Sequence, residues 1–263
     1  MTEVSILFAS RIKDNPPSNL EGLFNSAIQF LTLEELSKIE FVIKFDNDDD
    51  GRPDGAFLSK WPFPVKHVTF ERGEGRHDIN HFLNYLFTLR DRSSRFIINL
   101  ADDFIFTRPN FINEILSVKD SYAVMGGARC PHRGEMIIPN LRANFRDIES
   151  YISGVAEYCP IISTRVIEAV QNIGWQSSID VWAVMLAVGM MGKYQTNIWH
   201  NLQCFYRRCD DYRTHHKDLH AARYVYNAME WSAYQQCKNP YYYDLVEQQI
   251  TNIYLNMKNE GVL

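Results

Sequence analysis

The sequence lacks the features that mark several large classes of protein. Its five cysteines are odd in number and contain no CxxC pair, so neither a disulfide framework nor a cysteine-based zinc site is expected. No uninterrupted apolar run approaches the length of a membrane span, and no basic segment precedes an apolar signal core at the start. A formal net charge of −5 argues against general affinity for nucleic acid or anionic membranes. We therefore expect a cytoplasmic protein with reduced thiols and no nucleic-acid partner.

Internal repeats and low-complexity segments are also missing, which excludes a solenoid or a repeat array. With 263 residues, 46% of them hydrophobic and 22% charged, the chain has the composition of a folded protein that can bury a core. The last part of the chain differs in being rich in aromatic and polar side chains. We expect one domain over residues 1–220 and a helical C-terminal extension, residues 221–263, packed on it.

Strand and helix patterns alternate through the first part of the chain. Val4–Ala9, Ile39–Phe45 and Val65–Phe70 are short β-prone runs bounded by polar residues. Apolar residues at helical spacing follow the first run, over Leu20–Leu31, and the third run, from about Asp78. This order, with a polar loop after each strand, is typical of a parallel α/β sheet that binds ligands at the carboxyl ends of its strands.

The run Arg95–Asn110, RFIINLADDFIFTRPN, predicts a further buried strand that ends in two carboxylates. Asp102 and Asp103 would then lie in the crevice where open α/β sheets bind ligands. Adjacent carboxylates repel each other, so this placement favours a compensating cation such as manganese or magnesium, which prefers oxygen ligands. The alternative is an Asp-Asp turn in water, and the run alone favours neither.

Four carboxylates lie within five positions after the second strand, Asp46 and Asp48–Asp50. We expect Asp48–Asp50 to form a turn exposed to water. Asp46 is the first residue past the strand and would face the same crevice as Arg11 and Asp103. A calcium-binding EF-hand loop is excluded because its twelfth position is Phe57, which cannot supply a bidentate carboxylate.

The loop Arg72–His77 follows the third strand and combines two glycines with cations. Its cations, Arg76 among them, could meet a phosphate or a sugar. A solvated loop is the alternative, since a single Gly-x-Gly is weak evidence.

Three local signals predict further element boundaries. Thr32 and Glu35 form a capping-box pattern for a short helix. Pro109 suits the first position of another helix. Tyr122–Met125 predicts a strand that ends at Gly126.

Three of these runs resemble the GT-A glycosyltransferases, and within them the family-two group of inverting nucleotide-sugar transferases. VSILFASRIKD is similar to that group's opening strand with its Arg-bearing loop, VIKFDNDDDG to its second strand with the nucleoside-contacting Asp, and FIINLADDFIF to the strand with the DxD metal motif. The resemblance implies metal binding by Asp103, although Ala101 stands where DxD has its first carboxylate. The residues that it implies for binding the donor are Ser10, Arg11, Asp46, Arg76 and Asp102.

The second half of the chain extends the resemblance. SSIDVWAVMLAVGMMGKYQT is similar to the family's segment in which an acidic pair opens a helix. Asp180 matches the catalytic base, whereas Ile179 departs from the usual Glu; a helix-start carboxylate favoured by the macrodipole is the alternative. His200 is the candidate for a further metal ligand from late in the sequence, and the alternative is that this histidine has only a structural role. The resemblance implies that the basic segment Ala128–Ser150 helps to form the acceptor side; its cations could meet a charged acceptor or be solvated.

The resemblance implies an α/β fold of GT-A-like, Rossmann-like type: a mixed, mainly parallel sheet flanked by helices, with the helical C-terminal extension. It implies metal-dependent, inverting transfer of a hexosyl or pentosyl group from a nucleotide sugar to a hydroxyl of a glycan or another acceptor. A sugar-phosphate nucleotidyltransferase is one alternative, although the first strand lacks a glycine-rich phosphate loop. A catalytically inactive carbohydrate-binding relative is another, and Ala101 and Ile179 would suit it. Homo-oligomer formation is left open.

Overall fold

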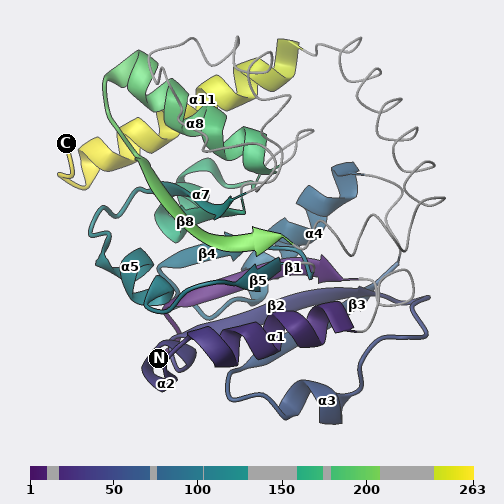
Figure 1. Cartoon of the computed structure of the whole chain (residues 1–263). Helices are drawn as coiled ribbons and strands as arrows, with labels where there is room; N and C mark the ends of the chain where they lie inside the picture. The colour runs from purple at the N-terminus through teal and green to yellow at the C-terminus, as the bar shows by residue number, and fades with distance from the viewer. Residues whose placement is uncertain (11–17, 72–75, 103, 130–158, 174–178, 208–239) are drawn as a thin grey trace.

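An eight-stranded sheet forms the centre of the computed structural model, which describes residues 1–10, 18–71, 76–102, 104–129, 159–173, 179–207 and 240–263 (Figure 1). The strand order is β3-β2-β1-β4-β7-β6-β8-β5. The strands are β1 (Val4–Ser10), β2 (Ile39–Asp46), β3 (Val65–Phe70), β4 (Phe96–Asn99), β5 (Phe104–Phe106), β6 (Val124–Arg129), β7 (Pro160–Ser163) and β8 (Trp199–Arg207). The helices are α1 (Ser18–Phe30), α2 (Leu33–Leu36), α3 (Gly55–Ser59), α4 (Arg76–Leu89), α5 (Phe111–Ser117), α7 (Thr164–Val170), α8 (Ile179–Tyr194) and α11 (Pro240–Asn259).

Most strands of the sheet run in one direction. β2 and β4 both pair in parallel with β1, and β3 pairs in parallel with β2. β7 is antiparallel to its neighbours β4 and β6, whereas β8 is parallel to β6. β5 closes the other side as an antiparallel partner of β8. The carboxyl ends of β1, β2, β3, β4, β6 and β8 therefore lie at one edge, called the carboxyl edge below, and the predicted mixed, mainly parallel sheet is confirmed.

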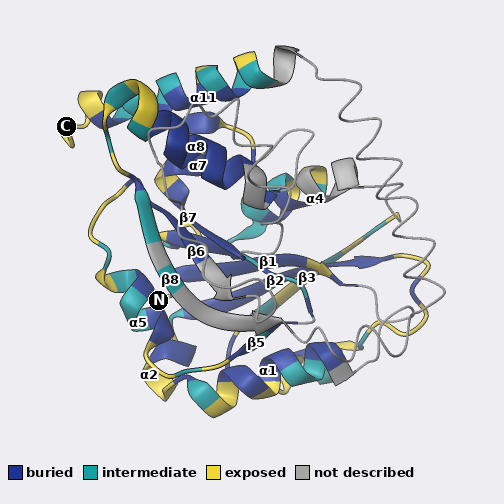
Figure 2. Cartoon of the chain, turned by 45° about the horizontal axis from the view of Figure 1, so that its top comes forward, coloured by how far each residue is buried: buried dark blue, intermediate teal, exposed yellow. Residues whose placement is uncertain are grey.

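Helices cover both faces of this sheet. Figure 1 shows α1 on one side and α4, α7 and α8 on the other. Side chains alternate between the two apolar layers along β1: Ile6 and Phe8 pack with Phe24 of α1, while Leu7 packs with Leu86 of α4. β2 is buried along its whole length, and Figure 2 shows burial continuing through β1 and α8. Such two-sided burial explains why these strands read as near-continuous apolar runs.

α11 packs on the outside of α8 and α7. Trp182, in α8, is fully buried and donates from Nε1 to Oε1 of Gln249 at 2.9 Å. The side chain of Ile250 packs against Gly189 so closely that a Cβ there would lie 2.1 Å from Ile250 Cδ1. The C-terminal helix is thus part of the same core, while the expected boundary at residues 220 and 221 lies outside the described residues. None of the described helices is long and apolar enough to cross a membrane.

Three predicted boundaries differ from the structure. The run Arg95–Asn110 holds two strands, because the chain leaves β4 after Asn99 and β5 pairs with the distant β8. Pro109 precedes the helix, which begins at Phe111 after Asn110 in the left-handed region (φ 61°). β6 does not end at its glycines, since pairing with β8 continues to Arg129 across a register shift after Gly126.

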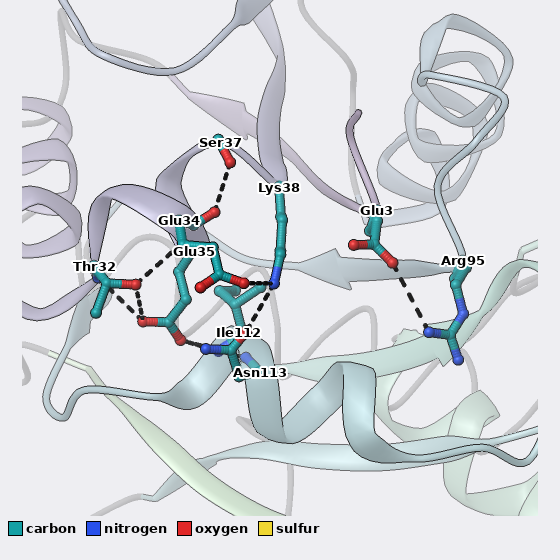
Figure 3. Close-up of polar contacts among 9 residues, drawn as sticks. All are labelled: Glu3, Thr32, Glu34, Glu35, Ser37, Lys38, Arg95, Ile112 and Asn113. Atoms are coloured by element: carbon teal, nitrogen blue, oxygen red, sulfur yellow. Dashed lines mark hydrogen bonds and ion pairs between the residues drawn. The ribbon is translucent and has the colours of Figure 1, made fainter.

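The predicted capping box at Thr32 is confirmed and is larger than the sequence indicates (Figure 3). Glu35 is fully buried, and its Oε2 accepts from the backbone N–H and the hydroxyl of Thr32, both at 3.1 Å. Its Oε1 accepts from the backbone N–H groups of Ile112 (3.0 Å) and Asn113 (3.3 Å) at the start of α5. One carboxylate thereby joins α2 to α5, the helix that follows β5.

Candidate functional site

Ser10 and Asp102 meet at the carboxyl edge, where β1 and the chain leaving β4 end. The Ser10 hydroxyl donates to Oδ2 of Asp102 at 2.6 Å, and both residues are buried. Val4 pairs with Phe96 in the β1–β4 ladder, and the Ser10–Asp102 contact preserves that offset beyond the last ladder pair, Leu7–Asn99. A buried carboxylate with a charge-assisted hydrogen bond is held in a defined orientation. The two residues therefore form a rigid polar pair at this edge.

Asp46 ends β2, directly beside β1, and is also buried. The ammonium of Lys44 donates to its Oδ1 and lies 4.2 Å from the centre of the Phe82 ring of α4. Alternation along the strand places Lys44 and Asp46 on the face of Val42, which packs in the α4 layer. Ser10 belongs to the opposite, α1-facing side. The two polar pairs thus approach the carboxyl edge from opposite faces of the sheet.

The acidic turn after β2 is only partly the solvated turn that the sequence predicts. Asp48 and Asp50 are exposed, as expected, but Asp49 is buried. Its Oδ1 accepts from the Gly51 backbone N–H at 3.1 Å, and its own N–H donates to the Asp46 carbonyl at 3.2 Å. Asp49 therefore folds the turn back on the end of β2 and fixes the backbone next to Asp46.

Two helices begin near the carboxyl edge. α4 begins at Arg76, a short segment after β3 ends at Phe70 on that edge. α8 ends at Tyr194, only four residues before β8 begins at Trp199 on the opposite edge, so its first residues, including Asp180, lie toward the carboxyl edge. The side chains of Arg76 and Asp180 are outside the described part of the chain. Helix N-termini provide backbone donors for anions, which suits this edge to a diphosphate.

Two further predicted site residues, Arg11 and Asp103, lie outside the described residues, as does nearly all of Ala128–Ser150. Among the residues that the structure describes, no group of three or more His, Cys, Asp and Glu side chains is arranged to hold a metal. The carboxylate of Asp102 is the right kind of donor for manganese or magnesium. The metal expectation consequently depends on Asp103, its neighbour in the sequence.

His200 does not lie with these residues. It is the second residue of β8, pairs with Met125 of β6, and its Nε2 is 3.1 Å from Oδ2 of Asp120. The end of β8 that approaches Phe104 is Arg207, seven residues farther along, which corresponds to about 23 Å of strand. The ladders across β6, β7 and β4 place His200 level with Ile6, short of the carboxyl edge and four strands away from β1, so we do not retain it as a ligand with Ser10, Asp46 and Asp102.

The sequence argument missed two residues of this site, Lys44 and Asp49. A signal for Lys44 was present, because it is the only charge within the otherwise apolar stretch FVIKF and stands two positions before Asp46, on the same face. No such signal marks Asp49, whose burial depends on how the turn folds against the sheet.

No protein family profile and no curated protein matches the sequence. The fold does match crystal structures of S. aureus TarS, residues 1–349, at 12% sequence identity over 78% of this chain. The TM-score is 0.53 for one TarS structure, 0.51 for the complex with UDP-GlcNAc and 0.53 for the complex with UDP. This chain spans 60%, 58% and 60% of those TarS chains, respectively. The protein therefore has a GT-A-type fold, shared with glycosyltransferases.

Proposed function

We propose that the protein is a glycosyltransferase that takes a sugar from a nucleotide-sugar donor and transfers it to an acceptor hydroxyl. The observation that carries the proposal is that Ser10, Asp46 and Asp102 all lie at the carboxyl edge, where three neighbouring parallel strands of a GT-A-type fold end or have just ended. Ligands of open α/β sheets bind outside such strand ends. TarS, which shares the fold, is described in complex with UDP and UDP-GlcNAc.

In this proposal Asp46 and Arg11 bind the nucleoside. An ionised carboxylate only accepts hydrogen bonds, so Asp46 suits a base that presents an N–H, such as uracil. We assign the diphosphate side of the donor to Arg76, at the first position of α4, and to the pair Ser10–Asp102. A uridine diphosphate sugar is the donor that fits these roles and the TarS complexes.

The proposal includes a manganese or magnesium ion that is bound by Asp103, with the sequence neighbour Asp102 in the same site. Bound there, the ion would neutralise the charge that develops on the departing diphosphate. Asp102 is already oriented by the Ser10 hydroxyl at 2.6 Å, which keeps a carboxylate at this edge in a fixed place. The substitution of Asp103 by Asn should abolish the metal dependence of donor binding while the protein stays folded.

The proposed transfer is inverting, with Asp180 as the general base. Direct displacement at the anomeric carbon needs a carboxylate that removes the proton of the attacking hydroxyl. The position of Asp180 at the start of α8, toward the carboxyl edge, supports this role. The acceptor is a glycan or another hydroxyl compound, and the basic segment Ala128–Ser150 is its proposed binding region.

Calorimetry with UDP, UDP-GlcNAc and CDP tests the donor assignment. The parent protein should bind the uridine nucleotides, and Asp46→Asn should weaken that binding about tenfold or more, as expected for loss of a charged acceptor. Asp50→Asn changes an exposed carboxylate of the same turn and is the matched control, which should bind like the parent. If Asp46→Asn bound UDP as tightly as the Asp50→Asn control, the donor assignment would be wrong.

A further inference from the structure

Lys44 is a cation inside the sheet. Its side chain is 3% exposed, and its ammonium has two described neighbours: the Oδ1 atom of Asp46 and the Phe82 ring, whose centre is 4.2 Å away. The residues before it on the same strand, Phe41–Ile43, are fully buried and apolar. An ammonium in such surroundings is costly to bury unless it is paired, whereas an aliphatic side chain would fill the same space without that penalty. The ion pair with Asp46 is therefore what offsets the cost of burying an ammonium at this position.

The pair restricts the Asp46 carboxylate. Lys44 reaches Asp46 along its own strand from two positions earlier, and Phe82 of α4 borders the ammonium at the same time. With one carboxylate oxygen held by the ammonium, rotation of the Asp46 carboxylate is restricted, and Phe82 of α4 limits where the ammonium can move. A buried, paired carboxylate presents its hydrogen-bonding lone pairs in a fixed direction.

We propose that Lys44 is a positioning residue that sets the base selectivity of the nucleotide site through Asp46. This inference rests on the proposed function, in which Asp46 contacts the nucleoside. A fixed, ionised carboxylate favours a base edge that offers a ring N–H, as uracil does, and disfavours cytosine, which offers a lone pair at the same ring position. A carboxylate that has lost its cation partner is held less firmly in that direction, so it discriminates less between the two edges.

The test is the ratio of the dissociation constants for CDP and UDP, measured by calorimetry. The parent protein should prefer UDP, and Lys44→Met should reduce that ratio about tenfold, toward the value of Asp46→Asn. The matched control is Lys66→Met. Lys66, on the neighbouring strand β3, also pairs with a buried carboxylate, Glu40, at 2.7 Å, but far from the carboxyl edge. The Lys66→Met substitution should lower the stability of the protein and leave the ratio of the CDP and UDP dissociation constants unchanged.

The variant Lys44→Met leaves a buried carboxylate without its cation and could fail to fold. The double variant Lys44→Met/Asp46→Asn removes both charges and keeps the inference testable. Because Lys44 acts only through Asp46, the double variant should show the same ratio as Asp46→Asn alone. A lower ratio in the double variant would mean that Lys44 contacts the nucleotide itself and would overturn the positioning role.

Two other outcomes separate this inference from the proposed function. If the parent prefers UDP but Lys44→Met weakens UDP and CDP by the same factor, Lys44 is merely structural and only the present inference is overturned. If the parent binds neither nucleotide, the proposed function and this inference are overturned together.

Discussion

The Ser10 hydroxyl donates a 2.6 Å hydrogen bond to Asp102, and both side chains are buried where their neighbouring strands end. The contact continues the offset of the β1–β4 ladder past its last pair. The segment after β4 is thereby kept beside β1 although it has left the sheet. This is how the fold holds a carboxylate at the carboxyl edge.

Ser10→Ala should destabilise the protein by about 1.5–3 kcal/mol, the usual value of a hydrogen bond to a charged group. The physical reason is that the Asp102 carboxylate remains buried but loses this donor. Urea unfolding monitored by circular dichroism measures the change. Ser37→Ala removes an exposed hydroxyl that donates to the Glu34 carbonyl, and this control should be nearly neutral. Equal effects of the two substitutions would contradict the role of Ser10.

Glu35→Ala should destabilise the protein by about 2–4 kcal/mol, because it removes the acceptor for backbone donors of both α2 and α5. Glu34 is the adjacent control: it is 72% exposed and pairs with Lys38 at 2.6 Å on the helix surface. Such exposed pairs contribute little, so Glu34→Ala should unfold at nearly the parent urea concentration. A Glu35→Ala midpoint equal to that of Glu34→Ala would show that the buried carboxylate does not join the helices.

Stability at high pH should depend on Tyr122. Burial, together with a hydrogen bond to Glu260, raises the pKa of Tyr122 from 10.0 to about 12. Its stabilising contribution is complete below about pH 10, the ionisation range of the unfolded chain, and is lost as the pH rises through about 12. The full loss is on the order of 2–3 kcal/mol.

Comparison of the parent with Tyr122→Phe isolates this effect from the other groups that titrate at high pH. The stability difference between the two proteins should change between pH 10 and 12, and absorbance should detect one tyrosine fewer ionising near pH 12 in the variant. A difference that is constant over this range would contradict the raised pKa.

Asp180→Asn should reduce turnover by roughly two to four powers of ten, the typical contribution of a positioned general base. Donor affinity should change little, because the base acts on the acceptor. Steady-state kinetics and calorimetry on the same preparation separate the two effects. Near-normal turnover in the folded variant would remove Asp180 from the mechanism.

The sequence was sufficient to predict, to within one residue, which residues end the first three parallel strands. Periodicity and polar boundaries located β1, β2 and β3 to within one residue, and parallel strands bring Ser10 and Asp46 to one edge as a matter of topology. The capping box at Thr32 was also predictable, since it is a contact within one short segment. Local sequence patterns are therefore reliable in this protein for features that depend on contacts within one short segment.

The features that the sequence did not predict depend on contacts between distant segments. β5 is a separate strand because β8 is available as its partner, which no local pattern shows. His200 has the chemistry of a ligand, but the strand pairing places it short of the carboxyl edge and four strands away from β1. Asp49 looks like a turn residue in water, yet the fold of the turn buries it. Burial of single polar residues thus follows from the assembled sheet.

The central claim, sugar transfer from a nucleotide sugar, is tested most directly by proton NMR of uridine diphosphate sugars incubated with the protein, with and without manganese. We expect metal-dependent consumption of a donor and release of UDP, with the product sugar in the opposite anomeric configuration. Asp46→Asn and Asp103→Asn should suppress this reaction, while Asp50→Asn should not. Binding without any donor consumption would indicate an inactive carbohydrate-binding relative, and consumption of a nucleoside triphosphate with a sugar phosphate instead would contradict the account.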